Sequence, residues 1–119
     1  MAKIQLLNKI SQVGLKQFND TYEIGDAITD PDAILVRSAA MHDMEFGASL
    51  KAIGRAGAGV NNIPVDRCAE EGIVVFNTPG ANANGVKELA IAALMLASRD
   101  IVGGIQWVNA LTADVAKSV

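Results

Sequence analysis

Short apolar runs separated by longer mixed segments recur along the first two thirds of this chain. Taken in order, these runs predict strands at residues 3–7, 22–24, 33–36, 52–54 and 73–76. The run at residues 33–36 contains no polar position, which is typical of a strand buried on both faces of a parallel sheet. We interpret the run at residues 73–76 in the same way.

The mixed segments between these runs predict helices. Ser11 has the character of an N-cap for a helix that extends to Phe18, and a second helix is expected within residues 41–50. Pro64 suits the first position of a third helix, which Gly72 ends. Strands that alternate with helices at short intervals predict an α/β fold with a parallel sheet flanked by helices.

The last part of the chain follows a different pattern. Residues 86–98 are rich in good helix formers and have almost no polar face after Glu88. Residues 100–119 are expected to be helical in part, because apolar side chains recur at roughly helical spacing. We interpret both helices as surfaces for another domain or another subunit, so a homo-oligomer is expected. The alternative is that Gly103 and Gly104 turn this arm back onto its own sheet.

Composition narrows the class of protein. The chain has 119 residues, of which 50% are hydrophobic and 19% charged, which fits a folded domain and argues against disorder. The net charge of −3 provides no basic surface for nucleic acid. A single cysteine, Cys68, fits a reducing compartment and a packing role. No signal peptide opens the chain, and the longest apolar run, residues 89–97, is too short to span a bilayer. A soluble cytoplasmic protein is therefore expected.

Polar or glycine-rich turns follow three of the predicted strands. These turns are Arg37-Ser38, residues 55–59 and Asn77-Thr78. Ligands of open parallel sheets bind outside the carboxyl ends of the strands, so these turns should share one rim. Arginine is uncommon at the end of a buried strand without a partner. Arg37 and Arg55 therefore either form salt bridges, for example with Glu88, or bind a small dianionic ligand.

The glycine-rich turn at residues 55–62 has two interpretations as well. The glycines make a tight turn between strand and helix, or their amides form a nest for an anion. The turn has the first two glycines of a dinucleotide fingerprint, but Asn62 occupies the place of the third. Residues 80–85 lack the middle glycine. The chain therefore contains no complete site for a pyrophosphate.

Other catalytic patterns are missing from the sequence. Ser38 has no obvious base, and no Gly-x-Ser-x-Gly motif is present. His42 is the only histidine, which leaves a zinc site almost without ligands. We therefore predict no metal site in this chain.

Four ordered blocks resemble a known family. Residues 35–39, 54–63, 72–80 and 82–88 are similar to the N-terminal part of the NAD-dependent D-2-hydroxyacid dehydrogenases. Within that family, Val-Arg-Ser and Gly-Arg-Ala-Gly are most similar to the phosphoglycerate dehydrogenases. The resemblance implies a flavodoxin-like substrate-binding domain over residues 1–81. Residues 82–119 would then be the inter-domain helix and the start of a truncated nucleotide-binding domain. The dinucleotide turn and the catalytic arginine, glutamate and histidine would lie beyond Val119, so no catalytic residue is expected within this chain.

Carried over by position, the resemblance implies a substrate site made of Arg37, Ser38, Arg55, Ala56, Gly57 and Asn77. Arg37 would bind the substrate phosphate with Ser38 nearby, and Arg55 would lie on the same rim. The backbone of Ala56 and Gly57 would hold the carboxylate, and Asn77 would shape the pocket. Ala58 stands where relatives often have a threonine that touches the nicotinamide part of NAD, so only a main-chain contact would remain.

Two positions depart from the family pattern. Asn61 stands where the family usually has aspartate, which affects how the turn is braced. Lys87 stands where the family usually has alanine, which puts a charge on the inter-domain helix. Neither departure removes the pattern of the substrate site.

The resemblance implies that the full-length parent oxidises 3-phospho-D-glycerate to 3-phosphohydroxypyruvate with NAD, in serine biosynthesis. The partner would be a small phosphorylated hydroxy acid, and the chain alone would be inactive. A close alternative is another D-2-hydroxyacid dehydrogenase, such as a glyoxylate or hydroxypyruvate reductase. Two others are a corepressor-like protein that senses a dinucleotide and a stand-alone ligand-binding module.

Overall fold

The computed structural model describes residues 1–111 of the chain. Contacts between Cα atoms divide the chain into two compact units, Met1–Ala81 and Asn82–Val119. The assignment of these units to substrate binding and to the start of a nucleotide-binding domain stays a prediction. Each unit is described by itself.

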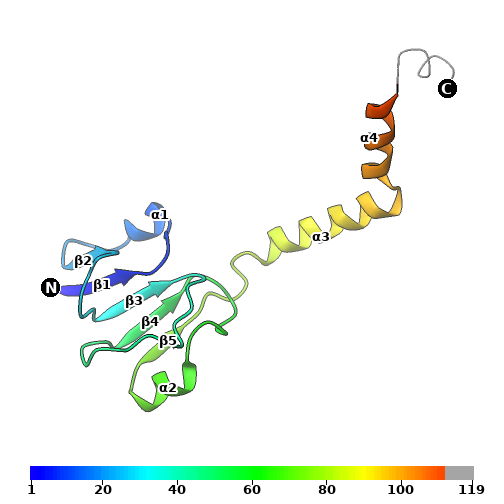
Figure 1. The fold of residues 1–119 in the computed structure, drawn as a ribbon. Helices are drawn as coiled ribbons and strands as arrows, with labels where there is room; N and C mark the ends of the chain where they lie inside the picture. The colour runs from blue at the N-terminus through cyan, green and yellow to red at the C-terminus, as the bar shows by residue number, and fades with distance from the viewer. Residues whose placement is uncertain (112–119) are drawn as a thin grey trace. The chain divides into compact units, whose positions relative to one another are not determined.

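The first unit contains a parallel sheet, which confirms the α/β prediction. Its strands are β1 (Ala2–Leu6), β2 (Tyr22–Gly25), β3 (Ala33–Val36), β4 (Ala52–Arg55) and β5 (Val74–Phe76). Their order is β2-β1-β3-β4-β5, and every neighbouring pair is parallel (Figure 1). This is the flavodoxin-like order, so the carboxyl ends of all these strands meet at one edge of the sheet.

The core lies on one face of the sheet. Ile34 and Val36 of β3 and Ile53 of β4 are buried there. They pack with side chains from the two long connections that follow these strands: Met41, Leu50, Ile63, Cys68 and Ile73. Ala33 and Leu35, which alternate with the buried positions, are only half-buried. Ile4 of β1, which lies beside Ala33 on that second face, is buried. β3 is therefore buried fully on one face and partly on the other, which agrees only in part with the prediction of burial on both faces.

The predicted helix within residues 41–50 does not form. This segment runs as turns and irregular backbone between β3 and β4. The Arg67 Nη2 atom donates to the carbonyl oxygens of Met41, at 3.4 Å, and Met44, at 2.7 Å. The guanidinium of Arg67 also lies 4.5 Å from the ring centroid of Phe46. Because a distant side chain satisfies these carbonyls, the segment keeps a non-helical path that a local pattern does not reveal.

Strand β5 is not the buried strand that the apolar run predicts. It pairs with β4 alone and forms one edge of the sheet. Ile73, just before the strand, is buried, whereas Val74 is 53% exposed and Phe76 is 60% exposed. An edge strand has a neighbour on one side only, so hydrophobicity by itself does not tell it from a central strand.

The short helices of this unit begin close to the predicted positions, but α1 is shorter than predicted. Helix α1 (Gln12–Leu15) begins after Ser11 but ends before Phe18, and the Ser11 side chain makes no capping hydrogen bond. Helix α2 (Val65–Glu70) follows Pro64 and packs on β5. Gly72 then takes a φ of 73°, and the Ile73 amide donates to the Cys68 carbonyl at 2.8 Å. Glycine is favoured at 72 because this φ is left-handed.

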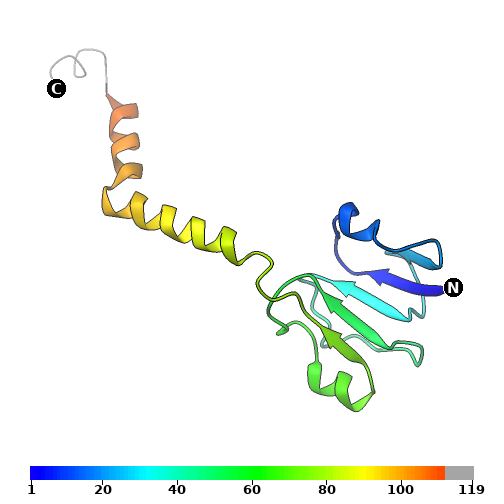
Figure 2. The same ribbon diagram turned by 180° about the vertical axis from the view of Figure 1, so that it is seen from behind.

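The second unit contains two helices, α3 (Ala83–Ser98) and α4 (Ile101–Ala110) (Figure 2). They confirm the predicted helix at residues 86–98. Asp100, with a φ of 46°, separates them, and its side chain accepts a hydrogen bond from the Gly103 amide. Gly103 and Gly104 lie inside α4 and do not form the turn of the alternative interpretation. The helix predicted beyond Ala110 falls mostly on residues 112–119, outside the described residues.

Neither helix of the second unit has a buried residue. Their large exposed hydrophobic side chains are Val86, Leu89, Ile91, Leu94, Met95, Leu96, Ile101, Val102, Ile105, Trp107 and Val108. Over residues 1–111, no helix has both the length and the apolar character needed to cross a membrane.

Candidate functional site

The three polar turns come together at the carboxyl edge of the sheet, as the strand pattern predicts. Val36 lies beside Arg55 in the register of β3 and β4, and Gly54 lies beside Phe76 in that of β4 and β5. Hydrogen bonds then link the turns beyond these residues. We call this region, made of residues 37–39, 55–59 and 77–78, the rim.

The guanidinium of Arg55 is held inside the rim. Its Nε atom donates to the carbonyl oxygen of Arg37 at 2.9 Å. The side chain passes so close to Gly57 that a Cβ atom there would lie 2.6 Å from Nη1. Glycine at position 57 is therefore what allows this path. Glu88, the carboxylate considered as a partner, accepts a hydrogen bond from Asn84 Nδ2 at 3.0 Å.

The amides of the glycine-rich turn are not equally available to a ligand. The Ala56 amide donates to the Val36 carbonyl at 2.8 Å, and the Gly57 amide donates to Thr78 Oγ1 at 2.8 Å. Both amides that the resemblance assigned to a carboxylate are therefore already paired. The amides of Ala58 and Gly59 donate to no group within residues 1–111. Of the rim amides at residues 56–59, those of Ala58 and Gly59 are thus the ones that remain available to a ligand.

Residues after β5 hold the glycine-rich turn in place. The Thr78 hydroxyl donates to the Arg55 carbonyl at 3.3 Å, and the Thr78 amide donates to the Gly57 carbonyl at 3.0 Å. Asn77 Nδ2 donates to the Ala58 carbonyl at 2.8 Å. Sequence reasoning selected Asn77 but missed the role of Thr78, although both belong to one polar turn.

Asn8, which contacts the rim from the segment after β1, is a second residue that sequence reasoning missed. Its Oδ1 atom accepts hydrogen bonds from three consecutive amides, those of Arg37, Ser38 and Ala39, at 2.8, 3.0 and 3.1 Å. The side chains of Arg37 and Ser38 are exposed. The backbone amides of this loop are thus hydrogen-bonded to Asn8, and the groups that remain for a ligand are the Arg37 guanidinium and the Ser38 hydroxyl.

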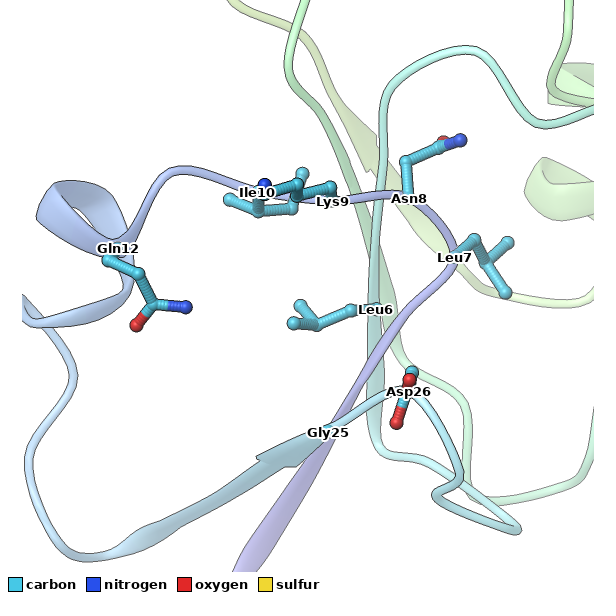
Figure 3. A pocket seen from close by; sticks show the side chains of 8 residues that line it. All are labelled: Leu6, Leu7, Asn8, Lys9, Ile10, Gln12, Gly25 and Asp26. Carbon is cyan, nitrogen blue, oxygen red and sulfur yellow. The ribbon is translucent and has the colours of Figure 1, made fainter.

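Two cavities lie near the carboxyl edge. A cavity of about 170 Å³ is part of the rim and is lined by Ile10, Leu35, Gly54, Arg55, Ala56, Phe76, Asn77 and Thr78. A larger one of about 420 Å³ lies beside β1 and β2 (Figure 3) and is lined by Leu6, Leu7, Asn8, Lys9, Ile10, Gln12, Gly25 and Asp26. The larger cavity is lined by a cation, Lys9, and a carboxylate, Asp26, whereas the smaller one includes the rim residue Arg55 beside mostly apolar side chains.

The glycine-rich turn does not fit a pyrophosphate. The helix after it, α2, is preceded by Pro64, which has no amide hydrogen, and the Val65 amide donates to the Ile63 carbonyl at 2.9 Å. A dinucleotide turn instead delivers free amides at a helix N-terminus. Ala58 is exposed and its carbonyl is paired with Asn77, so it can offer a nicotinamide ring its amide and its methyl group.

Two further reactive side chains lie away from the rim. His42 Nε2 donates to the Asn61 carbonyl at 2.7 Å. Cys68 has no exposed surface, and burial raises the pKa of its thiol above the ordinary value. Within the part of the chain that the structure describes, no three metal-ligating side chains come together.

Comparison with known proteins gives consistent matches. A family model described as D-isomer specific 2-hydroxyacid dehydrogenase, catalytic domain, matches residues 2–118. The D-3-phosphoglycerate dehydrogenase of Synechocystis is 40% identical over 101 residues, which cover 82% of this chain and 18% of that protein. The hydroxypyruvate reductase of Thermotoga maritima is 38% identical over 99 residues, which cover 81% of this chain and 32% of that protein. The chain therefore spans less than a third of the length of either relative.

Solved structures agree with the fold. The NAD⁺-bound 3-phosphoglycerate dehydrogenase of Entamoeba histolytica matches with a TM-score of 0.63 and 28% identity, over 80% of this chain and 38% of that one. The NADPH-dependent glyoxylate/hydroxypyruvate reductase of Sinorhizobium meliloti, in complex with citrate, matches with a TM-score of 0.76 and 25% identity. That match covers 92% of this chain and 39% of the reductase.

Proposed function

This chain belongs to the D-isomer specific 2-hydroxyacid dehydrogenases, and we propose that the protein containing it oxidises 3-phospho-D-glycerate with NAD. The chain would supply the part that binds the acid. The observation that carries this proposal is the pair of arginines on the rim, joined through the hydrogen bond from Arg55 Nε to the Arg37 carbonyl. Two guanidinium groups beside unpaired amides suit a ligand with two anionic groups.

The two anionic groups of the substrate would bind to different parts of the rim. Arg37 is exposed, so its guanidinium can reach a phosphate with the Ser38 hydroxyl beside it. The carboxylate would bind to the amides of Ala58 and Gly59, since those of Ala56 and Gly57 are already paired. Arg55, half-buried and fixed over Gly57, would add its positive charge to the carboxylate site.

The role of these residues in the reaction would be positioning. NAD, when bound, accepts the hydride that leaves C2 of the hydroxy acid. Holding both ends of the acid fixes C2 and its hydroxyl group between them, which lowers the entropic part of the barrier. His42, the only histidine of the chain, is bonded to the Asn61 carbonyl, so we do not assign it the hydroxyl proton. We therefore expect the polypeptide 1–119 alone to be inactive.

Replacing Arg37 tests the assignment of the phosphate. In the intact protein containing this chain, Arg37→Ala should raise KM for phosphoglycerate by about tenfold to a hundredfold, the range of a charged hydrogen bond. KM for NAD should not change. Lys51→Ala is a matched control, because Lys51 is an exposed cation that precedes β4 at the opposite edge of the sheet. An unchanged KM for phosphoglycerate in Arg37→Ala would show that the phosphate assignment is wrong.

A reductase of glyoxylate or hydroxypyruvate is the second candidate. Its support is the cavity of about 170 Å³, where Ile10, Leu35 and Phe76 form an apolar wall that a phosphate does not need. Turnover of phosphoglycerate, hydroxypyruvate and glyoxylate should be compared for the same preparation, with both nicotinamide cofactors. A higher kcat/KM for the acids without phosphate would favour the reductase.

A further inference from the structure

The loop of residues 37–39 lies where ligands of this fold class bind. In the order β2-β1-β3-β4-β5 the direction of the strand order changes between β1 and β3, and ligands bind beyond the carboxyl ends at such a point. Leu6 lies beside Leu35 in the register of these strands. Asn8, two residues after β1, therefore faces Arg37, one residue after β3.

Asn8 holds the amide side of this loop. One oxygen, Asn8 Oδ1, accepts from the amides of Arg37, Ser38 and Ala39 at 2.8 to 3.1 Å. Three consecutive amides that converge on one acceptor form a nest of the kind that binds anions. Because Asn8 fills this nest, an anionic ligand must meet the side chains of the loop.

Other segments hold the carbonyl side of the same loop. The Arg37 carbonyl accepts from Arg55 Nε at 2.9 Å and from Asn62 Nδ2 at 3.4 Å. The Ala39 carbonyl accepts from Asn62 Nδ2 at 2.8 Å. The loop backbone is therefore bound on one side by Asn8 and on the other by Arg55 and Asn62, while the side chains of Arg37 and Ser38 stay exposed.

We propose that Asn8 is a positioning residue, which fixes the backbone from which Arg37 and Ser38 reach the phosphate of the substrate. The identity of that substrate rests on the proposed function. An anchored backbone limits the conformations that Arg37 must lose on binding, which improves affinity without a new contact. An amide suits this position because it accepts three hydrogen bonds without placing a negative charge beside the guanidinium.

The test compares Asn8→Ala and Asn8→Asp in the intact protein containing this chain. Asn19→Ala is the matched control, because Asn19 Oδ1 also accepts from a backbone amide, that of Thr21 at 3.1 Å, away from the rim. Hydrogen exchange of residues 37–39, KM and kcat for phosphoglycerate, and the dissociation constant of inorganic phosphate should be measured for each variant.

Asn8→Ala should accelerate hydrogen exchange in residues 37–39 and raise KM for phosphoglycerate by about tenfold. This factor corresponds to the upper end of the net free energy that one hydrogen bond contributes. Phosphate affinity should fall by a similar factor, with kcat almost unchanged. Asn8→Asp retains the acceptor oxygen, so its exchange should lie nearer to that of the unaltered protein, whereas its negative charge beside Arg37 should raise KM for phosphoglycerate. Asn19→Ala should change neither quantity. If Asn8→Ala does not fold, Asn62→Ala, which removes the donor to the Ala39 carbonyl of the same loop, provides the same measurements.

Two results would overturn the proposal. Unchanged exchange in residues 37–39 would show that Asn8 does not anchor the loop, whatever the substrate is. Faster exchange with unchanged KM and unchanged phosphate affinity would show that the anchoring does not serve binding. If the unaltered protein does not turn over phosphoglycerate, the proposed function is wrong, and the exchange rates and phosphate affinity alone decide the role of Asn8.

Discussion

Replacing Gly57 by alanine should displace the guanidinium of Arg55 without destabilising the fold. The new Cβ atom would lie 2.6 Å from Arg55 Nη1, and ordinary contact begins at 3.4 Å, so the guanidinium must move by at least 0.8 Å. The displaced atoms belong to the end of a flexible side chain, so the backbone has no reason to shift. Gly57 is not among the glycines with positive φ, so alanine can adopt its backbone conformation.

The expected result is a change in binding without a loss of stability. A glycine-to-alanine replacement at a compatible position stabilises a protein by about 0.4–1 kcal/mol, because the unfolded chain has fewer conformations. A displacement approaching 1 Å of a group that holds the substrate can cost up to about a hundredfold, and we expect about tenfold in KM for the acid. KM for NAD should not change.

Steady-state kinetics and urea unfolding of the intact protein check both parts. Gly14→Ala is the control, because a Cβ atom there has no neighbour within 4 Å and only the effect on the unfolded chain remains. An unchanged KM for the acid in Gly57→Ala would refute the role of Arg55. A loss of stability greater than 1 kcal/mol would refute the view that only the side chain moves.

Further predictions concern the rim, the core and the buried thiol. Thr78→Val removes the acceptor of the Gly57 amide and should lower the free energy of unfolding by about 1 kcal/mol and raise KM for the acid, as urea unfolding and kinetics would show. Val36→Ala, at a side chain with 0% exposure, should cost about 2–3 kcal/mol in urea unfolding, whereas Val13→Ala, at 75% exposure, should cost less than about 0.5 kcal/mol; equal costs would contradict the described core. Burial raises the pKa of the Cys68 thiol in the folded state, so the unfolded thiol loses its proton first, and the free energy of unfolding should fall as pH rises above about 8.5. Urea titrations at several pH values should show that Cys68→Ala removes this part of the pH dependence. If the free energy of unfolding of Cys68→Ala still falls with pH as steeply as that of the unaltered protein, Cys68 is not its source.

Much of the sheet could be predicted because its strands are short, apolar and bounded by turn residues. Residues 33–36 match β3, and residues 52–54 match β4 except for Arg55 at its end. The helix expected within residues 41–50 failed because its carbonyls are satisfied by Arg67, which lies more than twenty residues away. Helical propensity describes a segment in isolation, and a long-range hydrogen bond can override it.

The candidate site was only partly accessible to sequence reasoning. Polar residues after successive strands predict a shared rim, since parallel strands end at one edge. Which amides are free to bind a ligand could not be predicted, because the acceptors for the Ala56 and Gly57 amides lie on β3 and after β5. The anchoring role of Asn8 depends on contacts that span 29 to 31 residues of the chain. Local sequence patterns do not reveal hydrogen bonds between residues so far apart in the chain.

The amino-acid sequence by itself determined the positions of the strands, the positions of the two rim arginines and the lack of a complete dinucleotide turn. These properties follow from local periodicity, from residue type and from the number of glycines. The tertiary structure decided which amides of the glycine-rich turn stay free, why Gly57 must lack a side chain and how residues 37–39 are anchored. Those outcomes depend on the register between β1, β3, β4 and β5, because register decides which distant donor meets which acceptor.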